Sequence, residues 1–377
     1  MTLSKNKKQI NWVTSSFLIG TALIALTAVP AYIWSYGLDW FQASLFLFYF
    51  IATGLSITLG YHRLFSHLAF KAKWPVRLFV LIFGAASFEN SALDWTCDHR
   101  RHHKHVDHDD DPYDITKGFF YAHMGWLLFR LKPKPPMDNV KDLKKDPLIM
   151  WQYRYCHWIG AFVGFVLPAI LGWYYGGTTS ALGAFLIAGV ARVVFVQQMT
   201  FLINSACHYF GSQPYSTKCT ARDSGFMALF TFGEGYHNFH HEFQHDYRNG
   251  VKFWQFDPTK WCIWLLSKVG LASDLRRVSP TKILLAEMAE AQKKIKSALE
   301  KPGMVPLQEK TSELIEASQI YIQELSEKIN ANIQEIQAGL SEKMEMPRRH
   351  IRAWRKDIRR GMRHLALLEK SLAYASA

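Results

Sequence analysis

Long apolar runs restrict what this chain can fold into more than any other feature of its sequence. About 20 apolar residues cross the hydrocarbon core of a bilayer as a helix, and inside lipid the backbone must satisfy its own hydrogen bonds. Four runs have this character and are expected as spans at residues 12–34, 38–60, 157–175 and 180–203. The turn sequences SYGLDW and YYGGTTS follow the first and third runs. We therefore predict an all-α membrane protein whose four transmembrane helices form two hairpins.

Basic residues next to these runs predict the orientation of the chain. The N-terminal MTLSKNKKQ and the stretch HRLFSHLAFKAKW after the second run are both basic, which favours the cytoplasmic side for each. The first run has no convincing small-residue cleavage site and is long enough to span, so we expect it to be retained. The net charge of +13 has no separate soluble basic stripe in the first 280 residues, so nucleic acid is not expected as a partner. We predict a multi-pass integral membrane protein with both termini in the cytoplasm.

The polar regions predict a cap and a C-terminal extension. Residues 76–88 are apolar but short and suit an interfacial helix, whereas residues 98–151 are largely polar and Pro-rich. Together they indicate a cytoplasmic helical cap, which completes a membrane domain over residues 1–280. Residues 281–377 are rich in Ala, Glu, Lys and Gln and predict an amphipathic helical extension. Such an extension can stabilise or dimerise the protein, lie on the membrane or dock an acidic partner.

Nine histidines gather in four short motifs beside the apolar runs. They are His62 and His67 in HRLFSH, His99, His102 and His103 in HRRHH, His208 in NSACH, and His237, His240 and His241 in HNFHH. Positions i, i+3 and i+4 share a helix face, so HRRHH and HNFHH can each present three imidazoles together. The two histidines of HRLFSH lie about 140° apart on an ideal helix. They therefore join one cluster if the helix ends or bends there, or serve two metals from opposite sides.

The number and type of these side chains predict a site for two metal ions. Ionisable groups next to hydrocarbon are costly and tend to be functional. Nine imidazoles overfill one tetrahedral zinc site, and five cysteines without a CxxC pair argue against a thiolate site. Imidazole ligation suits iron, copper, nickel or zinc. The nine divide naturally into four and five, and Asn204 could hold a water on the emptier metal.

HRLFSH, DHRRHH and GYHNFHH, in this order, resemble the three histidine boxes of the integral-membrane fatty acid desaturases. The elements NSACH and GFFYAHMGWLLFR are similar to those of the acyl-CoA (stearoyl-CoA-like) delta-9 branch, and the resemblance covers residues 36–275 approximately. It implies that the nine histidines bind two iron ions and that Asn204 completes one of them through water. It also implies that O2 is used to remove hydrogens from the ninth and tenth carbons of a saturated acyl chain, which leaves a cis double bond.

The resemblance also implies where the acyl carrier binds. Asn90, Trp95, Asp98 and Arg130 match positions at the coenzyme A headgroup, and Phe201 is expected to line the substrate tunnel by its position before His208. Cys97 and Leu131 depart from the animal enzymes, which carry an arginine and a lysine there. Charge-assisted contacts dominate phosphate recognition. Because these two positive charges are missing, a membrane lipid or an acyl carrier protein is an alternative to coenzyme A as the acyl carrier.

The expected reaction also needs groups that orient the imidazoles and a source of electrons. Glu89, Asp94, Asp98, Glu234 and Glu242 lie beside the motifs and are candidates to orient the imidazoles. The sequence has no HPGG motif of a fused cytochrome b5, so electrons are expected from a separate ferredoxin or cytochrome b5 type donor with its reductase. The basic cytoplasmic face suits an acidic donor.

Seven histidines are expected to be outside the metal site, namely His105, His108, His123, His157, His245, His350 and His364. The acids of KHVDHDDDP are expected to form a solvated loop, since their spacing fits a calcium loop poorly. Two other functions remain possible: a membrane di-iron hydroxylase with the same histidines, and a divalent-metal transporter. A transporter would place its ligands near the bilayer midplane, whereas these clusters fall just beyond the ends of the spans.

Overall fold

The computed structural model describes residues 9–130 and 136–299, together with scattered positions between 320 and 360. The chain divides into two compact units, which we describe separately. The first contains residues 9–212 and 219–277, and the second contains residues 213–218 and the chain from Val278 onward. The first unit is mostly helical and carries all four histidine motifs.

The first two helices of this unit are long and apolar. Helix α1 (Trp12–Tyr36) is followed after a short turn by α2 (Trp40–Leu55), which continues without a break into the π-helix η1 (Ser56–Ser66). Gly37 in the turn has φ 78°, a conformation that favours glycine. Asp39 caps α2 by accepting a hydrogen bond from Gln42 N at 2.7 Å. The predicted helices over residues 12–34 and 38–60 are therefore present.

A third apolar helical segment, Pro147–Tyr209, is 63 residues long and folds back on itself. It consists of α6 (Pro147–Ala161), η5 (Phe162–Val166), α7 (Leu167–Ala184), η6 (Phe185–Ala191) and α8 (Arg192–Tyr209). Gly176 and Gly177 inside α7 have non-helical backbone angles, which break the helix in the predicted YYGGTTS turn. The two arms pack so closely that a Cβ on Gly172 would come within 2.5 Å of Ser180 O. Small residues commonly permit such close approach between membrane helices.

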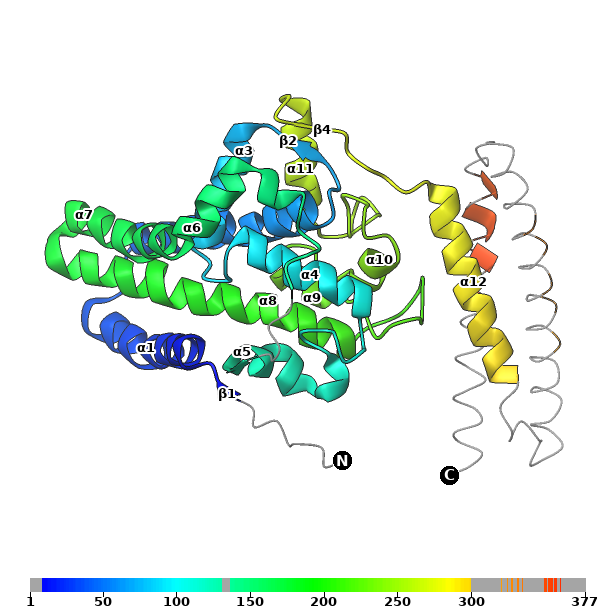
Figure 1. The fold of residues 1–377 in the computed structure, drawn as a ribbon, viewed down its shortest axis with the longest axis horizontal. Coiled ribbons are helices and arrows are strands. Elements are labelled where there is room, and N and C mark those ends of the chain that lie inside the picture. The colour runs from blue at the N-terminus through cyan, green and yellow to red at the C-terminus, as the bar shows by residue number, and fades with distance from the viewer. Residues whose placement is uncertain are drawn as a thin grey trace. The chain divides into compact units, whose positions relative to one another are not determined.

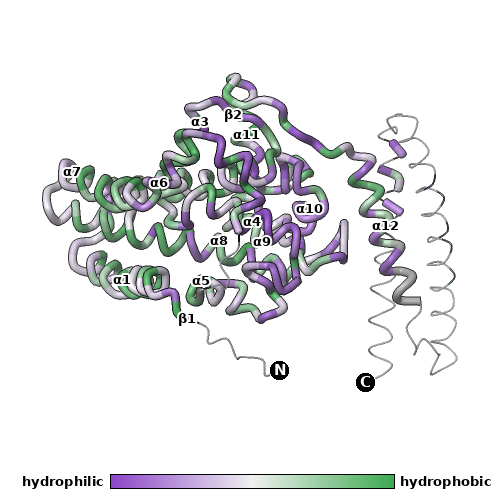
Figure 2. The backbone as a smooth tube through the Cα atoms, in the orientation of Figure 1, coloured by the Kyte–Doolittle hydropathy of each residue, from purple (hydrophilic) through white to green (hydrophobic). Residues whose placement is uncertain are grey.

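Within the described residues, three helical segments are long and apolar enough to cross a membrane: Trp12–Tyr36, Trp40–Ser66 and Pro147–Tyr209. Figure 2 shows hydrophobic residues along α1, α6 and α7 and hydrophilic residues around α4 and α10. The apolar arms therefore lie at one end of the first unit, and the polar helices with the histidine motifs lie at the other.

Short elements build the polar end of the first unit (Figure 1). The helices are α3 (Trp74–Ala85), α4 (Ala92–His105), η2 (Ile115–Lys117), η3 (Tyr121–Gly125), α5 (Trp126–Leu128), η4 (Leu143–Lys145), α9 (Gly225–Phe230), α10 (His237–Glu242) and α11 (Pro258–Lys268). Strand β1 (Gln9–Ile10) pairs antiparallel with β3 (Phe129–Arg130), and β2 (Lys71–Ala72) pairs antiparallel with β4 (Ala272–Ser273). Tyr61, Leu81, Leu93, Ile149 and Ile263 are fully buried in one core cluster that joins η1, α3, α4, α6 and α11.

The second unit contains helix α12 (Pro280–Leu299), which lies at the start of the predicted extension. Glu290 on this helix accepts hydrogen bonds from Thr217 N at 3.1 Å and Thr217 Oγ1 at 3.2 Å. The remainder of the predicted extension, residues 300–377, lies outside the described residues except at scattered positions.

Candidate metal centre and active site

The π-helix η1 brings the two histidines of HRLFSH to the same side, although an ideal α-helix would hold them about 140° apart. The N–H of His67 donates to the carbonyl of His62, five residues earlier, at 3.1 Å. A π-turn takes more residues than an α-turn, so residues five apart come nearly above one another. The two imidazole rings lie 4.7 Å apart. Of the two arrangements left open by the sequence, the structure adopts the one in which both histidines join one cluster.

Helices α4 and α10 each divide their three histidines between two clusters. On α4, His99 and His103 belong to one cluster and His102 to the other. On α10, His237 and His241 stay together while His240 belongs to the opposite cluster. Residues i and i+4 differ by about 40° around a helix, whereas i+3 and i+4 differ by about 100°. The i and i+4 imidazoles therefore point into the same cluster, and the i+3 imidazole points into its neighbour.

The nine histidines form two clusters, within each of which the ligand atoms lie within 4.8 Å of one another. The five-histidine cluster contains His62, His67, His99, His103 and His240, and the four-histidine cluster contains His102, His208, His237 and His241. Every Nε2 atom points inward. Neighbouring Nε2 atoms are 2.8–3.0 Å apart in the first cluster and 3.1–3.3 Å apart in the second. The division into five and four is the one inferred from the sequence.

Burial keeps these imidazoles in the form that binds metal. It lowers the pKa values of His99, His103, His237, His240 and His241 well below the ordinary value, and repulsion from neighbouring histidines lowers them further. A neutral imidazole can direct one nitrogen lone pair at a cation. Several lone pairs converging on a small buried volume have no favourable arrangement among themselves. The donor set of each cluster therefore fits one metal ion.

In each cluster, a carboxylate lies beside the outer nitrogen, Nδ1, of one histidine. Glu234 Oε2 lies 2.9 Å from His62 Nδ1, as expected for one of the five candidate carboxylates. Both oxygens of Asp111 lie 2.9 Å from His102 Nδ1. Asp111 is only 2% exposed, so the expectation that the acids of KHVDHDDDP are all solvated is wrong at this residue. Asp109 and Asp110 are exposed, as expected.

Hydroxyl groups contact the outer nitrogens of two further histidines, His208 and His99. His208 Nδ1 lies 2.8 Å from Thr220 Oγ1, and the same hydroxyl donates to Asp107 Oδ1 at 2.6 Å. Because the hydroxyl proton goes to Asp107, the hydroxyl must accept from His208 Nδ1–H, which leaves the Nε2 lone pair free for the cluster. The hydroxyl of Tyr113 lies 3.3 Å from His99 Nδ1. Nothing in the sequence marks Thr220 or Tyr113, because their spacing from the histidines follows no motif.

A buried network of charges supports Glu234 from behind. Arg63, which is 1% exposed, pairs with Glu234 at 2.9 Å and with Asp257 at 3.0 Å. Asn249 Nδ2 donates to the other Glu234 oxygen at 2.6 Å. A buried charge is stable only when it is paired and hydrogen-bonded. This network therefore fixes the carboxylate that holds His62.

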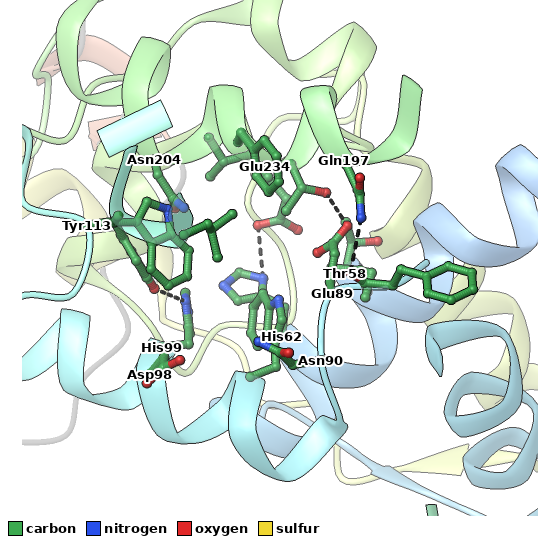
Figure 3. Close-up of a pocket in the computed structure, with 18 of the residues that line it drawn as sticks. Thr58, His62, Glu89, Asn90, Asp98, His99, Tyr113, Gln197, Asn204 and Glu234 are labelled. Carbon is green, nitrogen blue, oxygen red and sulfur yellow. Dashed lines mark hydrogen bonds and ion pairs between the residues drawn. The ribbon is translucent and has the colours of Figure 1, made fainter. Parts of the chain in front are cut away.

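A largely apolar cavity lies directly beside the clusters (Figure 3). Its wall includes His62, His99 and His237 from the clusters, and Asn90, Trp95, Asp98, Phe201 and Asn204 among the residues expected to contact substrate or water. Phe17, Leu18, Ile57, Phe88, Trp126 and Ile203 supply much of its apolar surface. Arg130 ends strand β3, but its side chain and the whole of Leu131 lie outside the described residues. Cys97 is buried in the core cluster next to the cavity.

Glu89 faces this cavity rather than a histidine. It accepts a hydrogen bond from Thr200 Oγ1 at 2.9 Å. Burial raises the pKa of Glu89 to about 8, although hydrogen bonds from Thr200 and Trp95 oppose the rise. The expectation that Glu89 orients an imidazole is therefore wrong, because its carboxylate contacts Thr200 at the cavity wall. Asp94 accepts a hydrogen bond from Ser91 Oγ at 2.6 Å at the start of α4, and Glu242 ends α10.

The histidines set aside in the sequence lie outside both clusters wherever the structure describes them. His123 Nδ1 lies 3.0 Å from Ser205 Oγ, and its Nε2 lies 2.9 Å from Gln198 Oε1. His245 Nδ1 lies 2.8 Å from the carbonyl of His67. His108 is exposed, and His364 falls outside the described residues.

Comparison with known proteins shows which family this chain resembles. The family model described as fatty acid desaturase matches residues 38–264. This chain belongs to the fatty acid desaturase family. The matched region of this desaturase-family chain begins in the turn before α2 and ends within α11, so it includes every histidine of both clusters.

Individual relatives of the desaturase-family chain carry related names. It is 42% identical to "Acyl-CoA desaturase 1" of Saccharomyces cerevisiae over 78% of this chain and 57% of the yeast protein. It is 39% identical to "Probable acyl-CoA desaturase" of Schizosaccharomyces pombe over 76% of this chain and 59% of that protein. It is 36% identical to "Stearoyl-CoA desaturase" of Homo sapiens over 73% of this chain and 76% of the human protein. The chain thus matches somewhat more than half the length of the two yeast proteins. The resemblance to the acyl-CoA branch is confirmed.

Proposed function

We propose that this chain is a membrane-bound, O2-dependent desaturase that introduces a cis double bond into a saturated fatty acyl chain. The observation that carries the proposal is the convergence of two clusters of inward-facing Nε2 atoms on the wall of an apolar cavity. An unactivated C–H bond resists acid–base chemistry, so the reaction requires an oxidising metal centre. The cavity provides the apolar surface that an acyl chain needs beside that centre.

Iron is the metal proposed for both clusters. One ion would be held by the five-histidine cluster of His62, His67, His99, His103 and His240. The other would be held by the four-histidine cluster of His102, His208, His237 and His241. Asn204 would bind this second ion through a water molecule. Imidazole ligands without thiolate are compatible with iron. When bound, a pair of iron ions supplies the redox chemistry that activates O2. Glu234, Asp111 and Thr220 would keep the ligand nitrogens oriented and unprotonated.

The substrate is proposed to be an acyl-CoA thioester desaturated at the ninth carbon. The names of the relatives, which include acyl-CoA and stearoyl-CoA desaturases, support this choice. Asn90, Trp95 and Asp98 on the cavity wall, together with Arg130, are proposed to contact the carrier. Cys97 and Leu131 supply no positive charge where the animal enzymes do. A lipid-linked or carrier-protein-linked chain is therefore the alternative that a carrier assay should include.

The proposed arrangement in the membrane has four spans. Breaking the segment Pro147–Tyr209 at Gly176 and Gly177 turns its two arms into a hairpin, which together with α1 and the segment Trp40–Ser66 gives two hairpins. Both hairpins would open toward the cytoplasm, with α3 along the interface and the remaining polar helices as the cap. Electrons would come from a separate acidic ferredoxin or cytochrome b5 type protein.

Product analysis in a host that lacks its own desaturase tests the proposal. Cells that express the chain, together with a donor and its reductase, should accumulate cis-unsaturated fatty acids with the double bond after the ninth carbon. The variant His240→Ala should yield none, while His108→Ala, which alters an exposed histidine of the cap, should yield as much as the wild type. A hydroxylated product without alkene would instead identify a hydroxylase.

A further inference from the structure

Helix α11 carries apolar side chains on its outward face as well as on its buried face. Ile263 is fully buried in the core cluster, and Cys262 and Leu266 pack against the same cluster. This inward face packs the helix against the unit. A surface helix normally places polar residues on the opposite side, so the outward face of α11 needs its own explanation.

The outward face of α11 consists of large exposed hydrophobic residues. Trp261, Trp264, Leu265 and Val269 are 44%, 51%, 57% and 62% exposed. At about 100° per residue, Trp261, Trp264 and Leu265 fall within an arc of about 100°, and Val269 follows directly after the last residue of the helix. The loop before the helix adds Phe253 and Trp254, which are 84% and 67% exposed. We call these residues the α11 patch. A continuous apolar patch of this kind marks a contact with a protein or a membrane.

The charges around the α11 patch favour a membrane. Lys252 and Lys268, which are both exposed, place their amines 5.7 and 5.4 Å from the rings of Trp254 and Trp264, respectively. Lys260 is buried, and its amine donates to the backbone carbonyls of the loop before the helix. The one acid between residues 251 and 269, Asp257, is buried and paired with Arg63. Tryptophan is enriched at the interface between lipid and water, and lysine can bury its stem while its amine reaches the headgroups. Every exposed charge of the patch therefore suits phosphate headgroups.

A pair of strands joins α11 to α3, the helix expected to lie along the membrane interface. Strand β4, which follows α11, pairs with β2, which precedes α3, and Lys73 N donates to Leu271 O at 2.9 Å. Figure 1 shows α3, β2, β4 and α11 together at one edge of the first unit. Trp74 and Phe79 on α3 are exposed in the same way. The two helices thus present aromatic residues from a joined pair of elements.

We propose that α11 is a second interfacial helix, whose outward face inserts into the headgroup region of the same bilayer that the apolar helices cross. The patch holds the polar end of the first unit against the membrane surface beside α3. The occupant of the patch is lipid, rather than a second copy of this chain or an electron donor.

Photochemical crosslinking of the full chain in phosphatidylcholine vesicles tests this proposal. The photoreactive amino acid benzoylphenylalanine would replace Leu265 in the patch, Leu23 on the exposed face of α1, or Asp109 in the exposed acidic loop. Mass spectrometry should find phospholipid adducts at positions 265 and 23 and none at 109. A lack of phospholipid adduct at 265 while 23 reacts, or an adduct of 265 with another protein chain, would overturn the proposal.

Discussion

At the scale of single residues, the outer nitrogens decide what the inner nitrogens can do. His62 and His102 face carboxylates through Nδ1, and His208 donates to a hydroxyl that is already committed to Asp107. In each case the Nδ1 proton is held, so Nε2 keeps its lone pair. The sequence indicated nine ligands divided into five and four, but not which histidine joins which cluster. The three imidazoles of HRRHH, and those of HNFHH, were expected to point the same way, and the structure divides each set between the two clusters. Nor did the sequence show that Asp111 is the acid that turns toward His102, because the spacing of the acids after HRRHH follows no motif.

Asp111→Asn tests this role. The substitution keeps the shape of the side chain but removes the charge opposite His102 Nδ1, so the metal affinity of the four-histidine cluster should fall by about 10–100-fold. Competition with a chelator measures this affinity in the purified protein. Asp109→Asn, in the exposed part of the same acidic run, serves as the control. Equal affinities in the two variants would show that Asp111 does not orient His102.

Glu89 predicts a pH dependence of stability. Its pKa in the folded protein, about 8, lies above the ordinary 4.5. Between these values the folded state retains a proton that the unfolded state has released, so the free energy of unfolding falls as the pH rises through this window and levels off above it. Thermal unfolding in detergent should show the decline in the wild type and a smaller one in Glu89→Gln. Parallel pH profiles for the two proteins would contradict the raised pKa.

At the scale of elements, one π-helix and the regular spacing of two α-helices place most of the ligands. The π-helix η1 brings His62 and His67 together, although an α-helix would have separated them. The α-helical spacing in α4 and α10 sends one histidine of each to the opposite cluster. Apolar periodicity predicts that a helix exists, but not that one of its turns closes on the fifth residue. That choice depends on packing, such as the contact of Gly60 with Val80 and of Gly84 with Tyr61.

In the folded-back segment Pro147–Tyr209, we expect replacement of Gly172 by a larger residue to destabilise the protein. A side chain at Gly172 would collide with Ser180 O and the Cβ of Ala184 on the returning arm. Gly172→Leu should therefore lower the free energy of unfolding by about 1–3 kcal/mol, the usual cost of overpacking. Gly20→Leu in α1, where no atom lies within 4 Å of the added Cβ, should not lower it. Thermal unfolding of both variants in detergent compares them, and similar losses would argue against close packing of the arms.

At the scale of the whole molecule, the sequence predicted the apolar helices, the turn at Gly176 and Gly177, and the division of nine histidines into five and four. These features follow from local composition and from the number of ligands that one metal accepts. The contacts of Thr220 and Tyr113 with His208 and His99, and the support of Glu234 by Arg63, join residues far apart in the chain. They follow from how the helices pack, and no spacing in the sequence encodes them.

The iron content of purified protein, with one histidine removed from each cluster, tests the central claim most directly. The wild type should hold about two iron ions per chain, and His103→Ala and His237→Ala should each hold about one, because each variant disables one cluster and leaves the other complete. His108→Ala, outside both clusters, should match the wild type. A wild type that holds a single ion, or a loss of both ions in one variant and of none in the other, would contradict two separate sites of five and four histidines.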